Sequence, residues 1–235
     1  MTTDRWLVLD CYVDDPEGGA GNFLPLLPGP AQSIRVPWHG ISGSPSDWRG
    51  LVITGSAASV CDGHEWVQSL TAFLRDAVSE GVPTLGVCFG HQVLAEAIGG
   101  DGTVRRSPTP ELGWFDIHHD GTDPILTGID KKFRTFLSHF DEVSPDLSGV
   151  NVLASSQRCP VQAFRVPNKP LWGVQFHAEM ALEEATRLVR KRVGVDPRLP
   201  GDPEEVLKDA MDSSSLVKRV VHNFVNATSQ GNTNS

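Results

Sequence analysis

The sequence has few cysteines, and no two of them form a pair of the kind that binds zinc or carries redox chemistry. The four cysteines are Cys11, Cys61, Cys88 and Cys159, and none belongs to a C-x-x-C motif. The N-terminus, Met1-Thr2-Thr3-Asp4-Arg5, lacks the basic and apolar regions of an export signal. We therefore expect neither disulfides nor a structural zinc site. A cysteine with a function should act through the reactivity of its thiol.

Positive charge and long apolar runs are also scarce. The chain has 20 Lys and Arg against 29 Asp and Glu, a net charge of -9, and its longest basic run is Arg190-Lys191-Arg192. This distribution is not typical of nucleic-acid-binding proteins. No segment approaches the ~18 apolar residues of a membrane span. We expect a cytoplasmic protein that binds neither nucleic acid nor membrane.

Internal repeats and clear linkers are absent as well, which favours one domain over residues 1–235. Hydrophobic residues make up 39% of the chain and charged residues 21%, as in ordinary globular proteins. We predict a core over about residues 5–192, a C-terminal helical extension over 203–227 and a disordered tail over 228–235.

Strand and helix patterns alternate in the first hundred residues, which predicts a parallel sheet with right-handed crossovers. Later short apolar runs predict an antiparallel insertion or a continued mixed sheet. The predicted strands are 5–10, 34–38, 50–54, 83–87, 114–118, 133–137, 151–154, 161–166 and 171–175. The predicted helices are a short one near Asn22 and those over 64–80, 92–98, 181–193 and 203–227.

The segment Gly86-Val87-Cys88-Phe89-Gly90 stands where a predicted strand ends and a predicted helix begins. Glycines on both sides allow a sharp turn that presents Cys88 at the top of the sheet, as in a nucleophile elbow. The free N–H groups and the dipole of a helix N-terminus favour a thiolate there. The alternative is that Cys88 is a small buried hydrophobic residue, as most free cysteines are.

A thiolate nucleophile needs a base, and His177-Ala178-Glu179 follows a buried strand pattern. Residues two apart in an extended segment face the same side, so Glu179 can accept the Nδ1 proton of His177 and leave Nε2 for the thiol. Taken alone, this segment is better explained as a surface His-x-Glu at a strand end. Together with Cys88 it predicts a nucleophile and its base.

Two other histidine segments are weaker candidates. His91 stands three residues after Cys88 but has no adjacent carboxylate and can simply pack. His118-His119-Asp120 lacks a third ligand at a recognisable spacing, so we predict no metal site.

Acyl transfer also needs hydrogen-bond donors for the oxyanion. The N–H of Phe89 is one candidate, and the loop Thr54–Ser59 offers others beside small side chains. An ordinary strand-to-helix turn explains this loop equally well. The residues alone predict a cysteine acyl transferase or hydrolase.

These segments, in this order, resemble the motifs of class I glutamine amidotransferases. Residues 86–92 resemble the nucleophile motif, residues 176–179 the His-x-Glu motif, and residues 53–56 the oxyanion strand. Leu112-Gly113-Trp114 and the segment Ser138–Val143 further resemble the stand-alone branch related to the glutaminase domain of GMP synthase.

The resemblance implies a flavodoxin-like, doubly wound α/β fold with a mostly parallel sheet flanked by helices. It implies no cofactor, and a reaction in which a thiolate cleaves the side-chain amide of glutamine through a γ-glutamyl thioester and releases ammonia. The implied catalytic triad is Cys88, His177 and Glu179, and the implied oxyanion hole is Gly55, Ser56 and Phe89. Gln92 and the backbone of Ser138, His139 and Phe140 are implied to hold the α-amino and carboxylate groups of the substrate.

The sequence departs from the family pattern at two positions. Gly55-Ser56 replaces paired glycines, and Phe140 replaces a glycine in the glutamine pocket. No phosphate-binding P-loop is present, so ammonia would leave or pass to a separate synthase. Two alternatives stay open: a γ-glutamyl peptidase or hydrolase with the same triad, and a non-catalytic regulatory or binding subunit.

Overall fold

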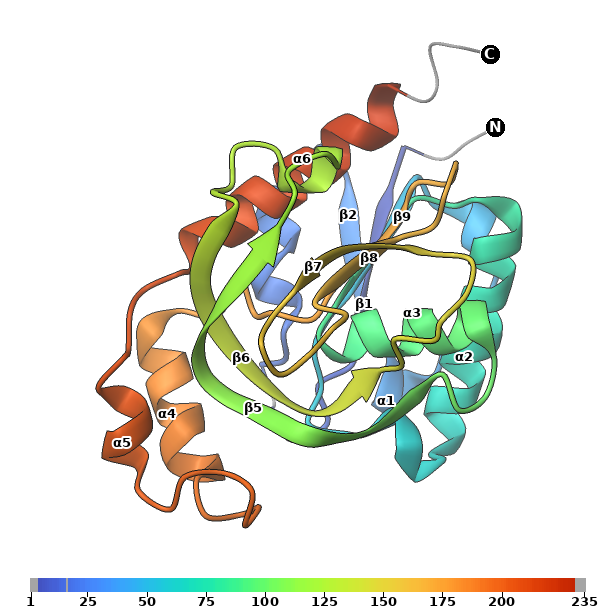
Figure 1. Ribbon diagram of the computed structural model, residues 1–235. Helices are drawn as coiled ribbons and strands as arrows, with labels where there is room; N and C mark the ends of the chain where they lie inside the picture. The colour runs from blue at the N-terminus through green and yellow to red at the C-terminus, as the bar shows by residue number, and fades with distance from the viewer. Residues whose placement is uncertain (1–3, 16, 231–235) are drawn as a thin grey trace.

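One nine-stranded mixed sheet forms the centre of the computed structural model, which describes residues 4–15 and 17–230 (Figure 1). The strand order is β2-β1-β3-β4-β9-β8-β7-β5-β6. The first part of the sheet is parallel and consists of β2 (Ala31–Arg35), β1 (Trp6–Asp10), β3 (Gly50–Ile53), β4 (Thr84–Val87) and β9 (Leu171–Val174). The remaining strands are added antiparallel, and they are β8 (Ala163–Arg165), β7 (Asn151–Ser155), β5 (Val104–His119) and β6 (Lys132–Val143).

Helices flank this sheet, so the predicted α/β fold is confirmed (Figure 1). The α-helices are α1 (Val36–His39), α2 (Glu65–Glu80), α3 (Phe89–Gly99), α4 (Leu182–Arg192), α5 (Pro203–Leu207) and α6 (Ser215–Gln230). Short 3-10 helices are η1 (Ala20–Asn22), η2 (Leu24–Leu26), η3 (Pro45–Asp47), η4 (Val60–Asp62) and η5 (Pro124–Leu126). Among the described residues, no helix has the length and apolar character needed to cross a membrane.

The inner parallel strands are buried because helices cover both of their faces, whereas β2 at the edge is partly exposed. Every residue of β1, β3, β4 and β9 is buried, as expected for continuous apolar runs in a parallel sheet. One face packs against α2 and α3, and the other packs against α6, whose Phe224 contacts Trp6 and Trp172 edge to face. A third apolar cluster joins α4 and α5 to β5 and β6, which lie beside these helices in Figure 1.

The predicted strand over 34–38 is wrong in position. The strand is β2, Ala31–Arg35, and the chain turns into α1 at Val36. Pro37 has no N–H to donate to a strand ladder, and its fixed φ suits the first turn of a helix. Near Asn22 the predicted short helix is the 3-10 pair η1 and η2.

The prediction of one helix over 203–227 is also wrong. Two helices form, α5 and α6, because contacts with the sheet hold the segment between them. The indole Nε1 of Trp114 donates to the Met211 carbonyl at 2.7 Å, and the Thr135 and Ser213 hydroxyls lie 3.2 Å apart. Residues 228–230, predicted to be disordered, belong to α6, and residues 231–235 of that predicted tail lie outside the described residues.

The middle of the chain forms a continued mixed sheet, one of the two predicted alternatives. β5 and β6 are much longer than the predicted strands and curve together along one side of the molecule (Figure 1). Their register shifts between Arg106 and Glu111. Pro108 and Pro110 lie in this interval, and proline cannot donate to a ladder, so the sequence places the irregularity there.

Candidate functional site

Parallel pairing of β4 with β9 brings the two predicted reactive segments to one edge of the sheet. Val87 pairs with Val174, so Cys88 leaves β4 where residues 175–177 leave β9. The N–H of Cys88 donates to the Val174 carbonyl at 2.8 Å, and the N–H of His177 donates to the Phe136 carbonyl at 3.0 Å. The site therefore lies at the carboxyl ends of parallel strands, where open α/β sheets hold ligands.

Cys88 has a strained backbone conformation, with φ 52° and ψ -104°. Such a conformation costs a non-glycine residue about 1–3 kcal/mol and is found mainly at functional sites. The flanking glycines have a different role from the one predicted, because neither has a positive φ. A Cβ on Gly86 would lie 2.3 Å from the Gly90 carbonyl oxygen, and a Cβ on Gly90 would lie 2.4 Å from that of Ile53. These glycines permit close packing, and Cys88 itself makes the turn.

The predicted base and its carboxylate lie beside this thiol. Nδ1 of His177 is 2.8 Å from Oε1 of Glu179, which leaves Nε2 as the free ring nitrogen. Cys88, His177 and Glu179 are all at least nine-tenths buried. Gly55 packs closely against both reactive side chains. A Cβ at this position would lie 3.0 Å from Cε1 of His177 and 3.7 Å from Cβ of Cys88.

The electrostatics of this group favour a charged imidazole. Burial lowers the pKa of His177, but the adjacent Cys88 sulfur and the Glu179 carboxylate outweigh burial and raise the pKa well above its ordinary value. A hydrogen bond to Cys88 contributes to the same shift. The arrangement can hold an imidazolium against a thiolate, and this pair can attack an acyl carbon and then protonate a leaving group.

The three predicted oxyanion residues lie near Cys88. Phe89 is the first residue of α3, so its N–H has no acceptor within the helix. The loop that carries Gly55 and Ser56 is tied to this helix, because the N–H of Gly90 donates to the Thr54 carbonyl at 3.1 Å. Ser56 and Phe89 line the same cavity of about 1050 Å³ as Cys88.

The predicted substrate-binding residues line this cavity too: Gln92, Ser138, His139 and Phe140. The Nε2 of Gln92 donates to the Asp141 carbonyl at 2.9 Å and to Oε1 of Gln175 at 3.0 Å. These bonds orient Gln92 and leave its Oε1 as an acceptor. The His139 ring faces Asp141 and Glu111, so the part of His139 that can meet a ligand is its backbone.

Several cavity residues were not predicted from the sequence. Tyr12 comes from the loop after β1, and Arg192 from the end of α4. Asp141, also in the cavity wall, accepts from Ser59 and, at 2.9 Å, from Nη1 of Arg106. Tyr12 and Arg192 stand in segments without a motif, so only their positions in the fold reveal them. Asp141 lies in the segment Ser138–Val143 that resembles the family, but its place in the cavity wall was not predicted.

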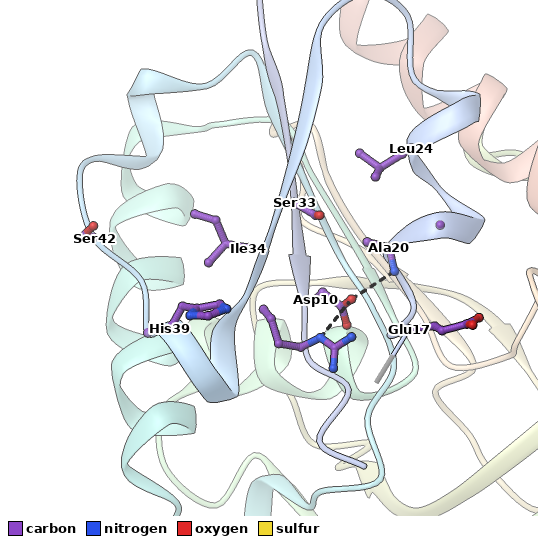
Figure 2. A pocket seen from close by; sticks show the side chains of 11 residues that line it. Asp10, Glu17, Ala20, Leu24, Ser33, Ile34, His39 and Ser42 are labelled. Carbon is purple, nitrogen blue, oxygen red and sulfur yellow. Dashed lines mark hydrogen bonds and ion pairs between the residues drawn. The ribbon is translucent and has the colours of Figure 1, made fainter. Parts of the chain in front are cut away.

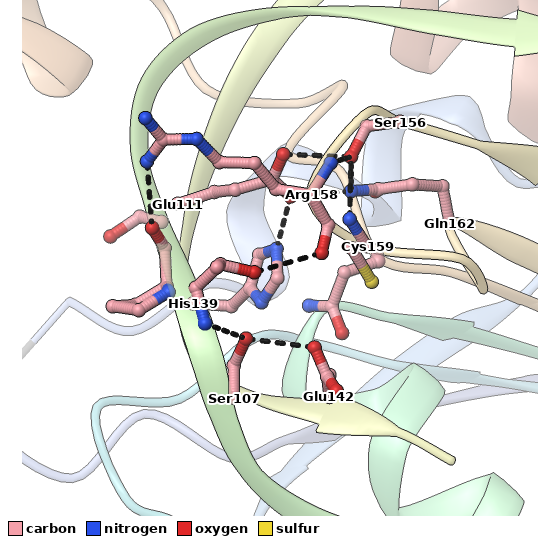
Figure 3. Close-up of polar contacts among 12 residues, drawn as sticks. Ser107, Glu111, His139, Glu142, Ser156, Arg158, Cys159 and Gln162 are labelled. Carbon is pink, nitrogen blue, oxygen red and sulfur yellow. Dashed lines mark hydrogen bonds and ion pairs between the residues drawn. The ribbon is translucent and has the colours of Figure 1, made fainter. Parts of the chain in front are cut away.

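A second group of Cys, His and Glu side chains lies deeper in the protein (Figure 3). Ligand atoms of Glu111, His139 and Cys159 lie within 4.8 Å of one another. Both ring nitrogens of His139 have partners: Nε2 is 2.8 Å from Oε2 of Glu111, and Nδ1 is 2.8 Å from the Asp141 carbonyl. Burial raises the pKa of Cys159 to about 12. This thiol therefore stays protonated and has no free imidazole nitrogen to serve as its base.

The carboxylate of this second group anchors three strands or loops. Glu111 on β5 accepts from Ser156 at 2.7 Å and from Gln162 at 2.6 Å as well as from His139 on β6 (Figure 3). These bonds fix the part of β6 that carries Ser138 to the cavity. The Glu111 group supports the site and lies behind it.

His91 also lies behind the site. Its ring is fully buried, packs 4.8 Å from the Phe164 ring, and has a pKa lowered to about 3 by burial. It is a neutral packing residue, as one interpretation of the sequence predicted.

A smaller cavity of about 600 Å³ lies between β1, β2, α1 and η1 (Figure 2). Asp10 lies at its base and accepts from the N–H groups of Gly19 and Ala20, at 3.1 and 3.3 Å. Nε of Arg35 is 3.4 Å from the same carboxylate. The buried charge of Asp10 is thus already neutralised by the protein.

The fold and the main cavity define an α/β protein with a thiol, an imidazole and a carboxylate at the carboxyl ends of its parallel strands. The family model described as glutamine amidotransferase class-I matches residues 32–194. The chain belongs to this family.

Two curated relatives and one solved structure illustrate the relationship. The chain is 39% identical over 139 residues to a subunit of the glutamine-hydrolyzing GMP synthase of Ignicoccus hospitalis, a match covering 59% of this chain and 71% of the relative. It is 41% identical over 104 residues to the glutamine-hydrolyzing GMP synthase of Parafrankia sp., covering 44% of this chain but only 19% of the relative. A glutamine amidotransferase structure from Thermotoga maritima superposes with a TM-score of 0.76 over 96% of this chain and 97% of that one. Its identity of 17% shows a shared fold.

Proposed function

We propose that this protein is a glutaminase subunit that hydrolyses the side-chain amide of glutamine and releases ammonia. The observation that carries the proposal is the contact among Cys88, His177 and Glu179 at the edge of the sheet. Membership of the amidotransferase family supports glutamine as the substrate. Cys88 is proposed as nucleophile, His177 as acid and base, and Glu179 as the group that orients His177.

In the first half of the reaction, the Cys88 thiolate attacks the Cδ carbon of glutamine. The carbonyl electron pair moves to oxygen, and N–H groups of Phe89 and the Gly55–Ser56 loop are proposed to stabilise the oxyanion. When the tetrahedral intermediate collapses, the C–N bond breaks and the His177 imidazolium gives its proton to the departing nitrogen. Ammonia and a γ-glutamyl thioester are the products of this half.

In the second half, neutral His177 takes a proton from water as the water oxygen attacks the thioester carbon. The C–S bond breaks, glutamate leaves, and the thiolate and imidazolium are restored. The raised pKa of His177 supports this cycle, because it favours the imidazolium that donates the first proton.

The ammonia acceptor is proposed to be a separate synthetase. The relative from Ignicoccus hospitalis is named as one subunit of its enzyme, and the match to the longer Parafrankia protein covers 19% of its length. A chain related to such subunits can supply ammonia to a second protein that holds the amination chemistry.

The two Cys-His-Glu groups provide a matched test. Cys88→Ala should abolish ammonia release from glutamine, whereas Cys159→Ala should retain activity within about threefold, since Cys159 is a protonated packing residue. The measurement is steady-state ammonia production by both purified variants. Activity that survives in Cys88→Ala and disappears in Cys159→Ala would overturn the proposal.

A γ-glutamyl peptidase or hydrolase is a second candidate, and the size of the cavity favours it. A volume of about 1050 Å³ matches pockets for ligands much larger than an amino acid, and Phe140 adds an aromatic ring to the wall. Comparing kcat/KM for glutamine with that for γ-glutamyl dipeptides separates the candidates, because the pocket and not the triad selects the leaving group.

A further inference from the structure

Arg192 brings a guanidinium group to the wall of the main cavity. It is the last residue of α4 and is half-buried. Its Nη1 donates to the Ser138 hydroxyl at 2.7 Å and lies 3.5 Å from the Ser138 carbonyl oxygen. Its Cζ is 5.9 Å from the centre of the Phe140 ring. Ser138 and Phe140 thus hold the guanidinium in place from two sides.

Most other basic residues of the cavity wall have a carboxylate partner, whereas Arg192 has none among the described residues; Arg187, which also forms no ion pair there, is exposed. Ion pairs hold Arg106 to Asp62 and Asp141, Lys191 to Asp14, and Arg198 to Asp196. Within the described part of the chain, Arg192 forms no ion pair, and both of its hydrogen bonds use Nη1. A half-buried cation with donors to spare favours an anionic ligand, and a planar guanidinium suits a carboxylate.

The guanidinium of Arg192 lies within reach of a glutamyl group attached to Cys88. The Ser138 carbonyl oxygen is 3.9 Å from Sγ of Cys88 and 3.5 Å from Nη1 of Arg192, so Sγ and Nη1 are at most about 7.4 Å apart. In a γ-glutamyl thioester, one C–S bond and four C–C bonds of about 1.5 Å each separate sulfur from the α-carboxylate carbon. An extended chain of that length reaches from Cys88 to the guanidinium.

We propose that Arg192 binds the α-carboxylate of the glutamyl group and so selects γ-glutamyl amides over amides without that carboxylate. This inference rests on the proposed function, because it requires an acyl group on Cys88. Ser138 then has two tasks, since its side chain orients Arg192 while its backbone lines the site. Arg192 is a specificity-determining residue that contacts substrate and leaves the chemistry at Cys88 unchanged.

Two thiol reagents separate recognition of the carboxylate from reactivity of the thiol. 6-Diazo-5-oxo-L-norleucine carries the α-amino and α-carboxylate groups of glutamine and alkylates a thiol with loss of N₂. Iodoacetamide alkylates the same thiol and has no carboxylate. The rate of Cys88 modification by each reagent is measured by mass spectrometry in wild type and in Arg192→Ala.

In Arg192→Ala, labelling by the diazo compound should fall about 10- to 100-fold, the loss expected for charged hydrogen bonds, while labelling by iodoacetamide stays within about twofold. Arg192→Lys keeps the charge but not the planar fork, so its labelling by the diazo compound should be intermediate. Arg190→Ala is the matched control, because Arg190 is exposed on the same helix, pairs with Glu204 and does not line the cavity. It should label like wild type with both reagents.

Unchanged labelling of Arg192→Ala by the diazo compound would overturn the inference. An equal fall with both reagents would also overturn it, because Arg192 would then act on the thiol or on the fold. If the proposed function is wrong, the result is different. Cys88 of the wild type would then react with each reagent no faster than the exposed Cys61 does.

Discussion

The charge of the His177 imidazole depends on its neighbours Cys88 and Glu179. A buried imidazolium is unfavourable by itself, yet the sulfur and the Glu179 carboxylate outweigh burial and raise the pKa of His177. The strain at Cys88 is offset within the same few residues, where Gly86 and Gly90 allow backbone contacts that any side chain would prevent. The chemistry of the site is thus a property of a small group of residues and not of one cysteine.

The alkaline limit of activity should follow from the raised pKa of His177. The imidazolium protonates the leaving ammonia, so kcat/KM should fall as pH rises through a pKa well above the usual ~6.5 of histidine. Because the native state binds this proton more tightly than the unfolded chain does, protonated His177 stabilises the fold at low pH. This stabilisation is lost as the pH rises through the raised pKa. Glu179→Gln removes a carboxylate that raises this pKa, so its alkaline limit should move to lower pH.

The measurement is the pH profile of kcat/KM for glutamine in wild type and in Glu179→Gln. Glu183→Gln is the control, because Glu183 is exposed on α4, and its profile should match wild type. An alkaline limit that stays in place in Glu179→Gln would contradict the assignment of His177 and Glu179 as a coupled pair.

Among the elements, α4 and α6 use amphipathic faces in different ways. Helix α4 buries Ala185 and Val189 against β5 and β6, while its Leu188 and Lys191 line the cavity. The described side chains of α6 do not line the cavity, and the helix packs on the sheet through apolar side chains around Phe224. The first helix shapes the site, and the second stabilises the sheet that carries it.

Truncating Phe224 should therefore weaken the fold more than any exposed change on α6. Its ring is fully buried, with centroids 5.7 Å from Trp6 and 5.9 Å from Trp172. Phe224→Ala should lower the free energy of unfolding by about 3–5 kcal/mol, the cost of a large aromatic cavity. Urea denaturation measures the change. Lys218→Ala, exposed on the same helix, should stay within about 0.5 kcal/mol of wild type; similar losses in both variants would contradict the packing role.

In the whole molecule, one continuous sheet connects all three apolar clusters. The cluster around α2 and α3 and the cluster around α6 lie on opposite faces of β1, β3, β4 and β9. The α4 and α5 cluster attaches to the same sheet through Trp114 and Phe136. Loss of the sheet removes a packing surface from every cluster at once, which favours cooperative unfolding.

We expect the chain to unfold in urea in one transition. Tryptophan fluorescence reports on Trp6 and Trp172 in one cluster and on Trp114 in another, and far-UV circular dichroism reports on the helices. The two signals should give the same midpoint. Separate midpoints would show that the α4 and α5 cluster is an independent unit and would contradict the one-domain prediction.

Local sequence patterns predicted much of this structure, because the interactions behind them are local. Apolar periodicity indicated α2 and the buried strands β1, β3, β4 and β9 with small errors at their ends. Motifs indicated which thiol, imidazole and carboxylate to consider together. The errors at α1 and between α5 and α6 arose where proline or distant side chains override periodicity.

Only the tertiary structure decided which separate segments share the site. Arg192 reaches the cavity because α4 packs on β5 and β6, and its contact with Ser138 joins residues 54 positions apart. The hydrogen bond from Ser59 to Asp141 joins residues 82 positions apart, and it too depends on how the elements pack. A local pattern carries no information on such contacts, since they depend on how the sheet orders its strands. The sequence by itself determined the elements and the reactive groups, and packing determined the pocket around them.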